Sequence, residues 1–284
     1  MPYTLSAEEI AQYHEEGYLI LRATQHGLVS PSALQEWSAE VKSWPKEKGK
    51  WMHYEEINSQ GQRQLLRTEN FVDYHPQLVA FLCGDDLTNL LAQLSGDDML
   101  LFKDKINYKS PKGNGFGAHL DAPAYDHIGK IDHVTANLAV DDATLENGCL
   151  EVVPGSHKQH VPFITGGHIT REWEESHTWL PVPLAPGDML IFGSHLAHRS
   201  GPNNSTRERA MIYATYSAKR DGTDLRQRYY ADRRENFPPE HERVEGKDYS
   251  KGWERYAFAA PFSMQGIKDQ ETPAPAAVAV GKVH

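Results

Sequence analysis

Several features that would point to a particular class of protein are scarce or missing in this chain of 284 residues. It has only two cysteines, Cys83 and Cys149, and they show neither Cys-x-x-Cys spacing nor a disulfide framework. We expect both to be buried as small hydrophobic residues, Cys83 at a helix end and Cys149 in a strand. The Gly-x-Ser-x-Gly motif is absent as well, which argues against a hydrolase of the Ser-His-Asp type.

Positive charge and long apolar segments are also in short supply. The formal net charge is −10 and no Lys/Arg-rich run occurs, which argues against nucleic acid or an anionic membrane as the main partner. No stretch of about 18 apolar residues could span a bilayer, and the first residues lack the regions of a signal peptide. We therefore expect a soluble, cytoplasmic protein that acts on a small molecule. The sequence favours no particular oligomeric state.

The length suits one large domain, which we place at residues 1–270. The last stretch, residues 271–284, is rich in Pro, Ala and Val without amphipathic pattern, so we expect a disordered tail. The first third reads as helical, beginning with a capping box at Ser6. The predicted helices cover residues 6–16, a segment opening at Ser30-Pro31, residues 76–82 and residues 85–94.

From Met99 onward the hydrophobic pattern changes to that of short strands. Gly, Pro, Asn or Asp bounds each one, and such spacing suggests a β-sandwich or barrel with the helical first third on its outer face. The predicted strands in this part are residues 99–108, 116–121, 133–140, 149–153, 189–192 and 209–216; earlier in the chain, residues 18–21 read as a strand and residues 64–71 as a possible strand and loop. Residues 163–180 form a long insertion, a kind of loop that often acts as a lid. The fold class is thus mainly β with flanking helices.

The residue types of a metal site appear in the segment from Gly113 to Ala124, at His119 and Asp121. Side chains two residues apart on a strand point to the same face, so the pair can offer a nitrogen and an oxygen to one cation. His198 is the candidate third ligand. Two histidines and one carboxylate form the facial triad of non-haem Fe(II) oxygenases, which keeps coordination positions open for catalysis. His195 would compete with His198 only if this turn were helical.

A His-x-Asp pair alone is weak support in a chain rich in both residues, but a second segment strengthens it. Pro186 to Phe192 is followed by His198, Ser200 and then Arg209. With the turn and strand from Glu146 to His157, these residues resemble the phytanoyl-CoA dioxygenase family of Fe(II)/2-oxoglutarate-dependent oxygenases. The resemblance extends from Ser6 to about Tyr216. It implies a double-stranded β-helix (a cupin-like jelly roll) with iron at the open end of the barrel.

The same resemblance implies roles for individual residues. The metal ligands would be His119, Asp121 and His198, and 2-oxoglutarate would be anchored by Arg209 and Ser200. A planar guanidinium suits this task because it binds a carboxylate through two charge-assisted hydrogen bonds. Arg207 is a rival for the anchor, but we expect Arg209 on the strand and Arg207 in the preceding turn.

Further roles rest on Phe102 to Tyr108, which is similar to the strand before the metal motif in ectoine hydroxylases and phosphonate dioxygenases of the family. By that comparison the Asn107 amide helps to bind 2-oxoglutarate, and Lys105 and Tyr125 line the substrate pocket. A surface lysine and a packing aromatic are the alternatives for the last two. Thr135 and Asn137 share one face of the next strand, which suits a substrate pocket inside a barrel or equally a solvent-facing edge.

The resemblance implies an enzyme that uses Fe(II), 2-oxoglutarate and O2, releases succinate and CO2, and hydroxylates a small metabolite or natural product. Asp121 argues against halogenation, while desaturation, epoxidation and ring formation stay open. One alternative is a Zn- or Mn-dependent cupin-like enzyme that does not use 2-oxoglutarate; another is a non-catalytic barrel that binds a small ligand. Lys105 and the arginines after residue 217 favour an anionic substrate, although we expect most of those arginines at the surface: Arg220, Arg226, Arg228, Arg233 and Arg234.

Overall fold

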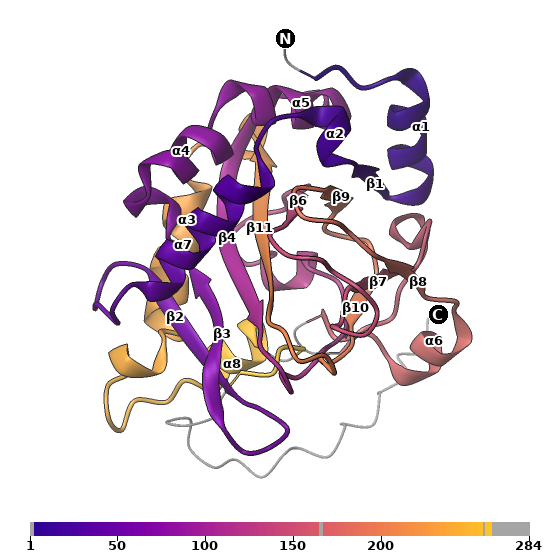
Figure 1. The fold of residues 1–284 in the computed structure, drawn as a ribbon. Coiled ribbons are helices and arrows are strands. Elements are labelled where there is room, and N and C mark those ends of the chain that lie inside the picture. Colours follow the sequence, from indigo (N-terminus) through magenta and orange to yellow (C-terminus); the bar gives the residue numbers. More distant parts are fainter. Residues whose placement is uncertain (1–2, 165–166, 258, 263–284) are drawn as a thin grey trace.

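The computed structural model describes residues 3–164, 167–257 and 259–262. Its strands are β1 (Tyr18–Leu21), β2 (Met52–Ile57), β3 (Arg63–Glu69), β4 (Met99–Lys109), β5 (Phe116–His119), β6 (Val134–Ala139), β7 (Leu150–Val152), β8 (Leu180–Val182), β9 (Met189–Gly193), β10 (His198–Ser200) and β11 (Arg209–Ala218). They form a seven-stranded sheet in the order β1-β9-β6-β11-β4-β3-β2 and a four-stranded sheet in the order β5-β10-β7-β8. Figure 1 shows how these strands are arranged. Side chains of both sheets meet in one hydrophobic cluster between them.

Helices flank these sheets, as the sequence predicts. They are α1 (Ala7–Glu16), α2 (Ala23–His26), α3 (Pro31–Ser43), α4 (Pro76–Leu82), α5 (Asp85–Ser95), α6 (Arg171–Ser176), α7 (Leu225–Asn236) and α8 (Ser250–Tyr256), with a short 3-10 helix η2 (Ala122–Ala124). The predicted capping box of α1 is confirmed: the Glu9 amide donates to the Ser6 hydroxyl, and the Ser6 amide donates to the Glu9 carboxylate. Ser30 caps α3 by accepting a hydrogen bond from the Ala33 amide.

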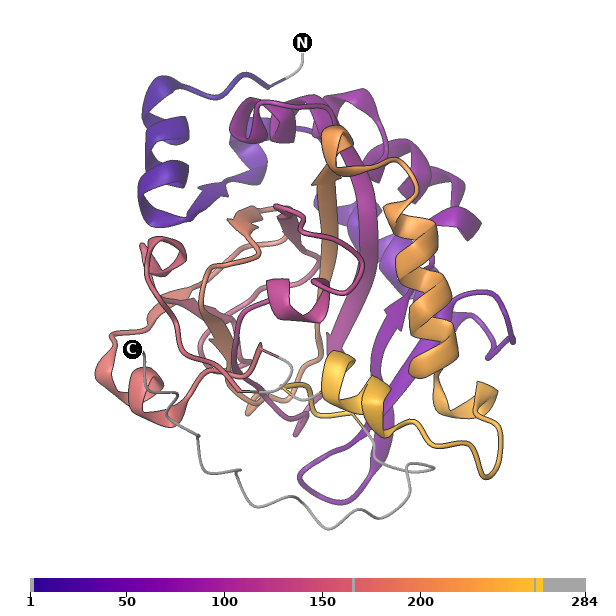
Figure 2. The ribbon, with the colours of Figure 1, turned by 180° about the vertical axis from the view of Figure 1, so that it is seen from behind.

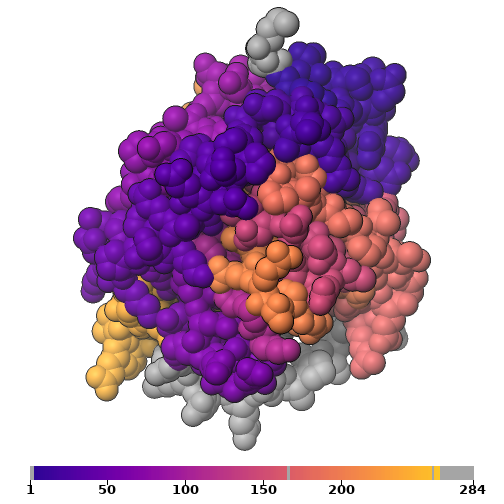
Figure 3. All heavy atoms as spheres, in the orientation of Figure 1, coloured from indigo at the N-terminus to yellow at the C-terminus, as the bar shows by residue number. Residues whose placement is uncertain are grey.

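The outer face of the large sheet is covered by the N-terminal helices. Alternate residues of its central strands, such as Ile106, Leu138 and Ile212, pack with Leu34 of α3 and Leu90 of α5, and all five are fully buried. A space-filling view from the same side shows this N-terminal part, in indigo and violet, spread over much of the surface (Figure 3). The prediction that the helical first third packs on the outside of the β structure is confirmed.

The other face of the large sheet looks toward the small sheet. Phe192 of β9 and Met211 of β11 pack there against Val152 of β7 and Val182 of β8. Because side chains alternate along a strand, the same face of β4 carries the odd-numbered residues from 103 to 109, which are polar: Lys103, Lys105, Asn107 and Lys109, all buried. A polar inner wall of this kind is what a site requires and a plain hydrophobic core would not tolerate.

The C-terminal helices close one side of this interior. Helix α7 contacts β4, and α8 contacts α7 and η2, as the view from behind shows (Figure 2). An aromatic cluster holds them in place; Tyr229, Tyr256 and Phe237 pack with Phe102 of β4 and Tyr54 of β2. The sequence analysis did not predict these two helices, because charged residues dominate both segments.

Some expectations need correction. Arg233 of α7 is fully buried and pairs with Glu69, whereas we expected the late arginines mostly at the surface. Cys83 is exposed at the end of α4, whereas Cys149 is buried as expected. Strands β2, β8 and β10 were not predicted. The predicted tail, residues 271–284, lies outside the described residues. No helix in the described ranges has the length and apolar composition needed to cross a bilayer.

Candidate metal centre and its pocket

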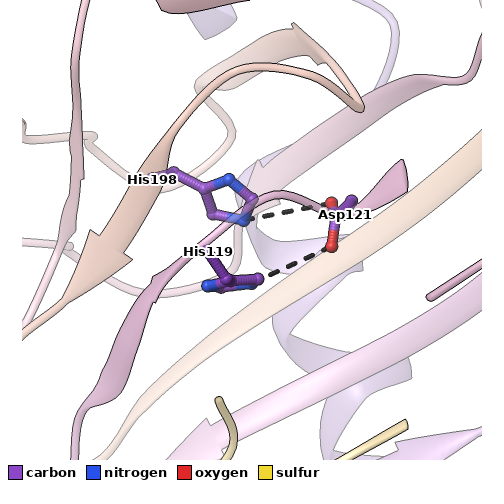
Figure 4. Close-up of side chains that lie close together, drawn as sticks. All are labelled: His119, Asp121 and His198. Carbon is purple, nitrogen blue, oxygen red and sulfur yellow. Dashed lines mark ion pairs between the residues drawn. The ribbon is translucent and has the colours of Figure 1, made fainter. Parts of the chain in front are cut away.

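Three side chains, two from neighbouring strands and one from the start of η2, converge on one point (Figure 4). His119 ends β5 and His198 begins β10, and the antiparallel register places these two residues opposite each other. Asp121 Oδ1 lies 3.9 Å from His119 Nε2, and Asp121 Oδ2 lies 3.9 Å from His198 Nε2. Their candidate ligand atoms all lie within 4.8 Å of one another. Two imidazole nitrogens and a carboxylate oxygen so close together can share one divalent cation.

Both imidazoles are held in the tautomer that a metal requires. His119 Nδ1 lies 2.7 Å from the Gly117 carbonyl oxygen, and His198 Nδ1 lies 2.9 Å from the Leu196 carbonyl oxygen. A carbonyl can only accept, so Nδ1 carries the proton in each ring and the Nε2 lone pair faces the site. Burial lowers the pKa of His119 to about 3 and also lowers the pKa of His198. Both rings are therefore neutral near pH 7, the state that binds a metal.

Asp121 reaches the site by a route that differs from the prediction. We expected a strand through residue 121, but β5 ends at His119, and Asp121 has helical backbone angles at the start of η2. Pro123 in the first turn of η2 is incompatible with a continuing ladder, and the amides of Asp121 and Ala122 both donate to the Ser194 carbonyl. Burial raises the pKa of the Asp121 carboxyl, but interactions with His198, Lys105, His119 and Lys103 lower it more strongly, leaving the pKa below its ordinary value.

Competing ligands do not gather at this point. Among the described residues, His119, Asp121 and His198 are the one group of His, Cys, Asp or Glu side chains close enough to hold a metal. His195 lies in a non-helical turn and is exposed. The condition under which it would compete with His198 is therefore not met.

The predicted 2-oxoglutarate anchors come together at one end of the inner face. Arg209 of β11 is paired with Lys109 of β4 in the sheet, and both side chains are about 2% exposed. Arg209 donates to the Gly148 carbonyl oxygen, and Lys109 Nζ donates to the same oxygen at 3.3 Å and to Ser200 Oγ at 2.9 Å. Neither cation forms an ion pair with a carboxylate in the described part of the chain. Arg207 lies in the preceding turn and is exposed.

A pocket that is partly open to solvent lies over the metal ligands. Of the predicted residues, the three ligands and Ser200, Asn107, Lys105 and Tyr125 line it. Arg209 is not among the lining side chains. Asn107 Oδ1 accepts a hydrogen bond of 2.7 Å from Arg67 Nε.

Thr135 and Asn137 are placed differently. Both are buried on β6, away from solvent and outside the set of residues that line the pocket. Thr135 Oγ1 lies 3.0 Å from Thr215 Oγ1, and Asn137 Nδ2 donates to the Ile212 carbonyl oxygen at 3.3 Å. They connect β6 to β11 inside the sheet. Neither a solvent-facing edge nor contact with the pocket describes them.

The pocket also has walls that the sequence analysis missed. Lys103 and Arg67 line it beside Lys105, and Tyr256, Ala259 and Ala260 of the C-terminal segment form its outer wall. Insertion residues 163–180, as far as they are described, do not line it. The lysines at positions 103, 105 and 109 of one strand did not reveal this lining, because the same pattern fits a strand with one face in solvent.

Comparison with known proteins identifies the family. The model of the phytanoyl-CoA dioxygenase family (PhyH) matches residues 13–211. The chain is 43% identical over 242 residues to dioxygenase lolE1 of Epichloe uncinata, which covers 85% of this chain and 94% of the relative. It is 37% identical over 257 residues to a 2-aminoethylphosphonate dioxygenase of an uncultured bacterium, covering 90% of this chain and 97% of the relative.

A solved structure has the same fold. EctD from S. alaskensis, crystallised with 2-oxoglutarate and 5-hydroxyectoine, matches with a TM-score of 0.66 over 76% of this chain and 77% of that chain, at 20% identity. This match confirms the predicted double-stranded β-helix, a cupin-like jelly roll with flanking helices. The chain therefore belongs to the phytanoyl-CoA dioxygenase family, and it is an oxygenase of the Fe(II)/2-oxoglutarate-dependent type.

Proposed function

We propose that this protein hydroxylates a C–H bond of a small organic molecule, with Fe(II) bound by His119, Asp121 and His198. The observation that carries the proposal is that all three ligands line one wall of the pocket. Three protein ligands leave further coordination positions of an iron ion for a co-substrate and O2. A substrate in the pocket would lie next to those positions.

The donor set fits iron in its charge state as well as its geometry. Two neutral imidazoles and one ionised carboxylate reduce the charge of Fe(II) by only one, so the bound metal still attracts an anionic co-substrate. Carbonyl groups at Gly117 and Leu196 fix the two rings through their Nδ1–H groups. Such outer contacts orient the metal ligands before the metal arrives.

Lys109 and Arg209 support 2-oxoglutarate as the co-substrate. They are two buried cations side by side, bound only to neutral acceptors, and burial together with the charge of Arg209 lowers the pKa of Lys109. Buried charges normally have a partner of opposite sign. We infer that the distal carboxylate of 2-oxoglutarate is the partner of these two cations, with Ser200 as a further hydrogen-bond donor to it. Asn107 would contact 2-oxoglutarate nearer the metal.

The bound iron and 2-oxoglutarate supply the oxidising chemistry: one oxygen atom of O2 enters succinate as CO2 is released, and the other enters the C–H bond. The chain contributes positioning in a pocket lined by buried ligands and cations. Lys105 and Tyr125 stay candidates for contact with the substrate, since both line the pocket. The bacterial relative is named as a dioxygenase of 2-aminoethylphosphonate, which supports a small polar substrate for this protein.

The test is anaerobic addition of 2-oxoglutarate to the Fe(II)-loaded protein, followed by visible spectroscopy. We expect the metal-to-ligand charge-transfer band of a chelated keto acid, which weakens in Arg209→Ala at equal 2-oxoglutarate concentration. Iron that binds with no such band would contradict the proposal and favour a metal enzyme that does not use 2-oxoglutarate. Absence of stoichiometric metal binding would favour a non-catalytic barrel.

A further inference from the structure

A second group of buried cations, apart from Lys109 and Arg209, lines the pocket. Lys103 and Lys105 occupy alternate positions on the inner face of β4, and Arg67 of β3 stands beside them, opposite Asn107. Their exposed fractions are 5%, 9% and 4%, respectively. All three line the pocket together with His119 and Asp121. We call Arg67, Lys103 and Lys105 the cation cluster.

The cluster is short of negative charge. Glu69 is the carboxylate nearest to it in the sheet, where it is paired with Lys105 across β3 and β4. Its Oε1 accepts from Arg67 at 3.0 Å and from Arg233 at 2.8 Å, and its Oε2 lies 2.7 Å from Arg233 Nε. Glu69 is thus shared between two guanidinium groups. One carboxylate cannot compensate four buried cations.

The two lysines have little else to hold their charge. Lys105 Nζ lies 4.6 Å from the centre of the Tyr213 ring and forms no hydrogen bond with a described residue. Lys103 Nζ lies 3.5 Å from the Tyr125 hydroxyl, at the limit of a hydrogen bond, and 5.3 Å from the ring centres of Tyr125 and Tyr229. Burial lowers the pKa of Lys103 and lowers that of Lys105 to about 8. A structural role would be served better by apolar side chains.

Asp121 does not remove the deficit. Its carboxylate points to His119 and His198 and would bind the metal, whose positive charge exceeds its own. The cofactor end does not explain the cluster either. Lys105 and Lys109 are four residues apart on one strand, which separates their Cα atoms by about 13 Å. A single carboxylate group cannot span that distance.

We propose that the cation cluster is the binding site for an oxyanion group of the substrate, a phosphonate, phosphate ester or carboxylate held by Arg67, Lys103 and Lys105. The anion would neutralise the excess charge of the cluster, with Tyr125 close enough to Lys103 to join the contact. A carbon next to the anionic group would then face the metal ligands, which line the same pocket. This inference rests on the proposed function, because it assumes that the metal site oxidises the carbon next to the bound anionic group.

The test uses three small probes of similar shape: ethylphosphonate, propionate and propionamide. Each is titrated anaerobically into the protein loaded with Fe(II) and saturating 2-oxoglutarate. Binding is followed by the change in the charge-transfer band and, independently, by the shift of the thermal unfolding midpoint. We expect saturable binding of both anions, tighter for the doubly charged phosphonate, and none of the neutral amide. Amide binding as tight as that of the anions would overturn the proposal.

Variants assign the binding to the cluster. Lys105→Met and Lys103→Met should each weaken anion binding about 10- to 100-fold, the effect of losing one charge-assisted hydrogen bond. They should leave 2-oxoglutarate binding unchanged. Lys130→Met, the same change at an exposed lysine of the loop after Asp121, should bind the anions like the wild type. Because Lys105→Met also removes a buried charge without a hydrogen-bond partner, we expect its unfolding midpoint to rise.

The outcomes separate this proposal from the one on which it rests. If the wild type forms no charge-transfer band, the proposed function fails, and the thermal shift still reports whether anions bind the cluster. If the band forms but both lysine variants bind the anions like the wild type, only the cluster assignment fails. Weaker 2-oxoglutarate binding in Lys105→Met would also overturn it, because the cluster would then belong to the co-substrate.

Discussion

Replacement of Lys109 by methionine tests the position of the co-substrate most sharply. Lys109 and Arg209 lie side by side without a carboxylate partner, and Lys109 Nζ is 2.9 Å from Ser200 Oγ. If these three groups hold the distal carboxylate of 2-oxoglutarate, Lys109→Met removes one of two charged donors. A hydrogen bond to a charged group contributes about 1.5–3 kcal/mol. The dissociation constant of 2-oxoglutarate should therefore rise about 10- to 150-fold.

The stability of the same variant is expected to change little. The acceptors Gly148, Gly201 and Ser200 lose a donor, which destabilises the folded protein. Against this, the variant no longer buries two like charges next to each other. Because the two effects oppose one another, we expect the free energy of unfolding to change by less than about 2 kcal/mol.

The assay is an anaerobic titration of 2-oxoglutarate into the Fe(II)-loaded wild type, Lys109→Met and Lys130→Met, followed by the charge-transfer band. Lys130 is the matched control because its side chain is exposed. Circular dichroism and urea denaturation verify that each variant is folded. An unchanged dissociation constant in folded Lys109→Met would refute the assignment of the cation pair to the co-substrate.

Three further predictions follow from other buried groups. Asp121→Ala should lose most of its bound iron in a metal analysis, and wild-type iron content would argue against the proposed ligand set. Glu69→Gln should lower the free energy of unfolding by about 3–5 kcal/mol because it leaves buried guanidinium groups without a carboxylate partner. Glu175→Gln, in an exposed ion pair, is the control and should lower it by at most about 0.5 kcal/mol. Equal losses of the two variants in urea denaturation would contradict this. Burial lowers the pKa of His133 to about 3, so the folded protein keeps it neutral while the unfolded chain is protonated below about pH 6.5. The contribution of neutral His133 to the free energy of unfolding is therefore fully present above that pH and is lost as the pH falls. Between about pH 7.5 and about pH 5 the wild type should lose about 2 kcal/mol more of its free energy of unfolding than His133→Phe; an identical pH dependence in both proteins would disprove this.

The metal ligands could be predicted from the sequence because their chemistry leaves a local signature. His119 and Asp121 are two residues apart, and His198 is followed by Ser200 and Arg209, which helped to identify it. The backbone at Asp121 could not be predicted from spacing alone. Its helical angles depend on Pro123 and on hydrogen bonds to Ser194, which is distant in sequence.

Helices α1, α3, α4 and α5 and most strands could also be predicted, since caps and hydrophobic periods are local. Strands β8 and β10 were missed because three residues carry too little periodicity to be recognised. Strand β2 was missed because its sequence alternates poorly and contains His53 and two glutamates.

The cationic lining of the pocket was largely missed for a different reason. Lysines at alternate positions normally indicate a solvent-facing strand, and Lys103 and Lys109 are buried only because distant segments cover them. Helices α7 and α8, more than a hundred residues later, supply Tyr229 and Tyr256 to that cover. Burial of this kind is a tertiary property, so no local pattern could have shown it.

A crystal structure of the protein grown without oxygen, with Fe(II) and 2-oxoglutarate, tests the central claim most directly. We expect the anomalous signal of iron among His119, Asp121 and His198. The distal carboxylate of 2-oxoglutarate should contact Arg209, Lys109 and Ser200, and the cation cluster should stay available for the substrate. Iron bound elsewhere, or a distal carboxylate on Lys105 and Arg67, would contradict the account.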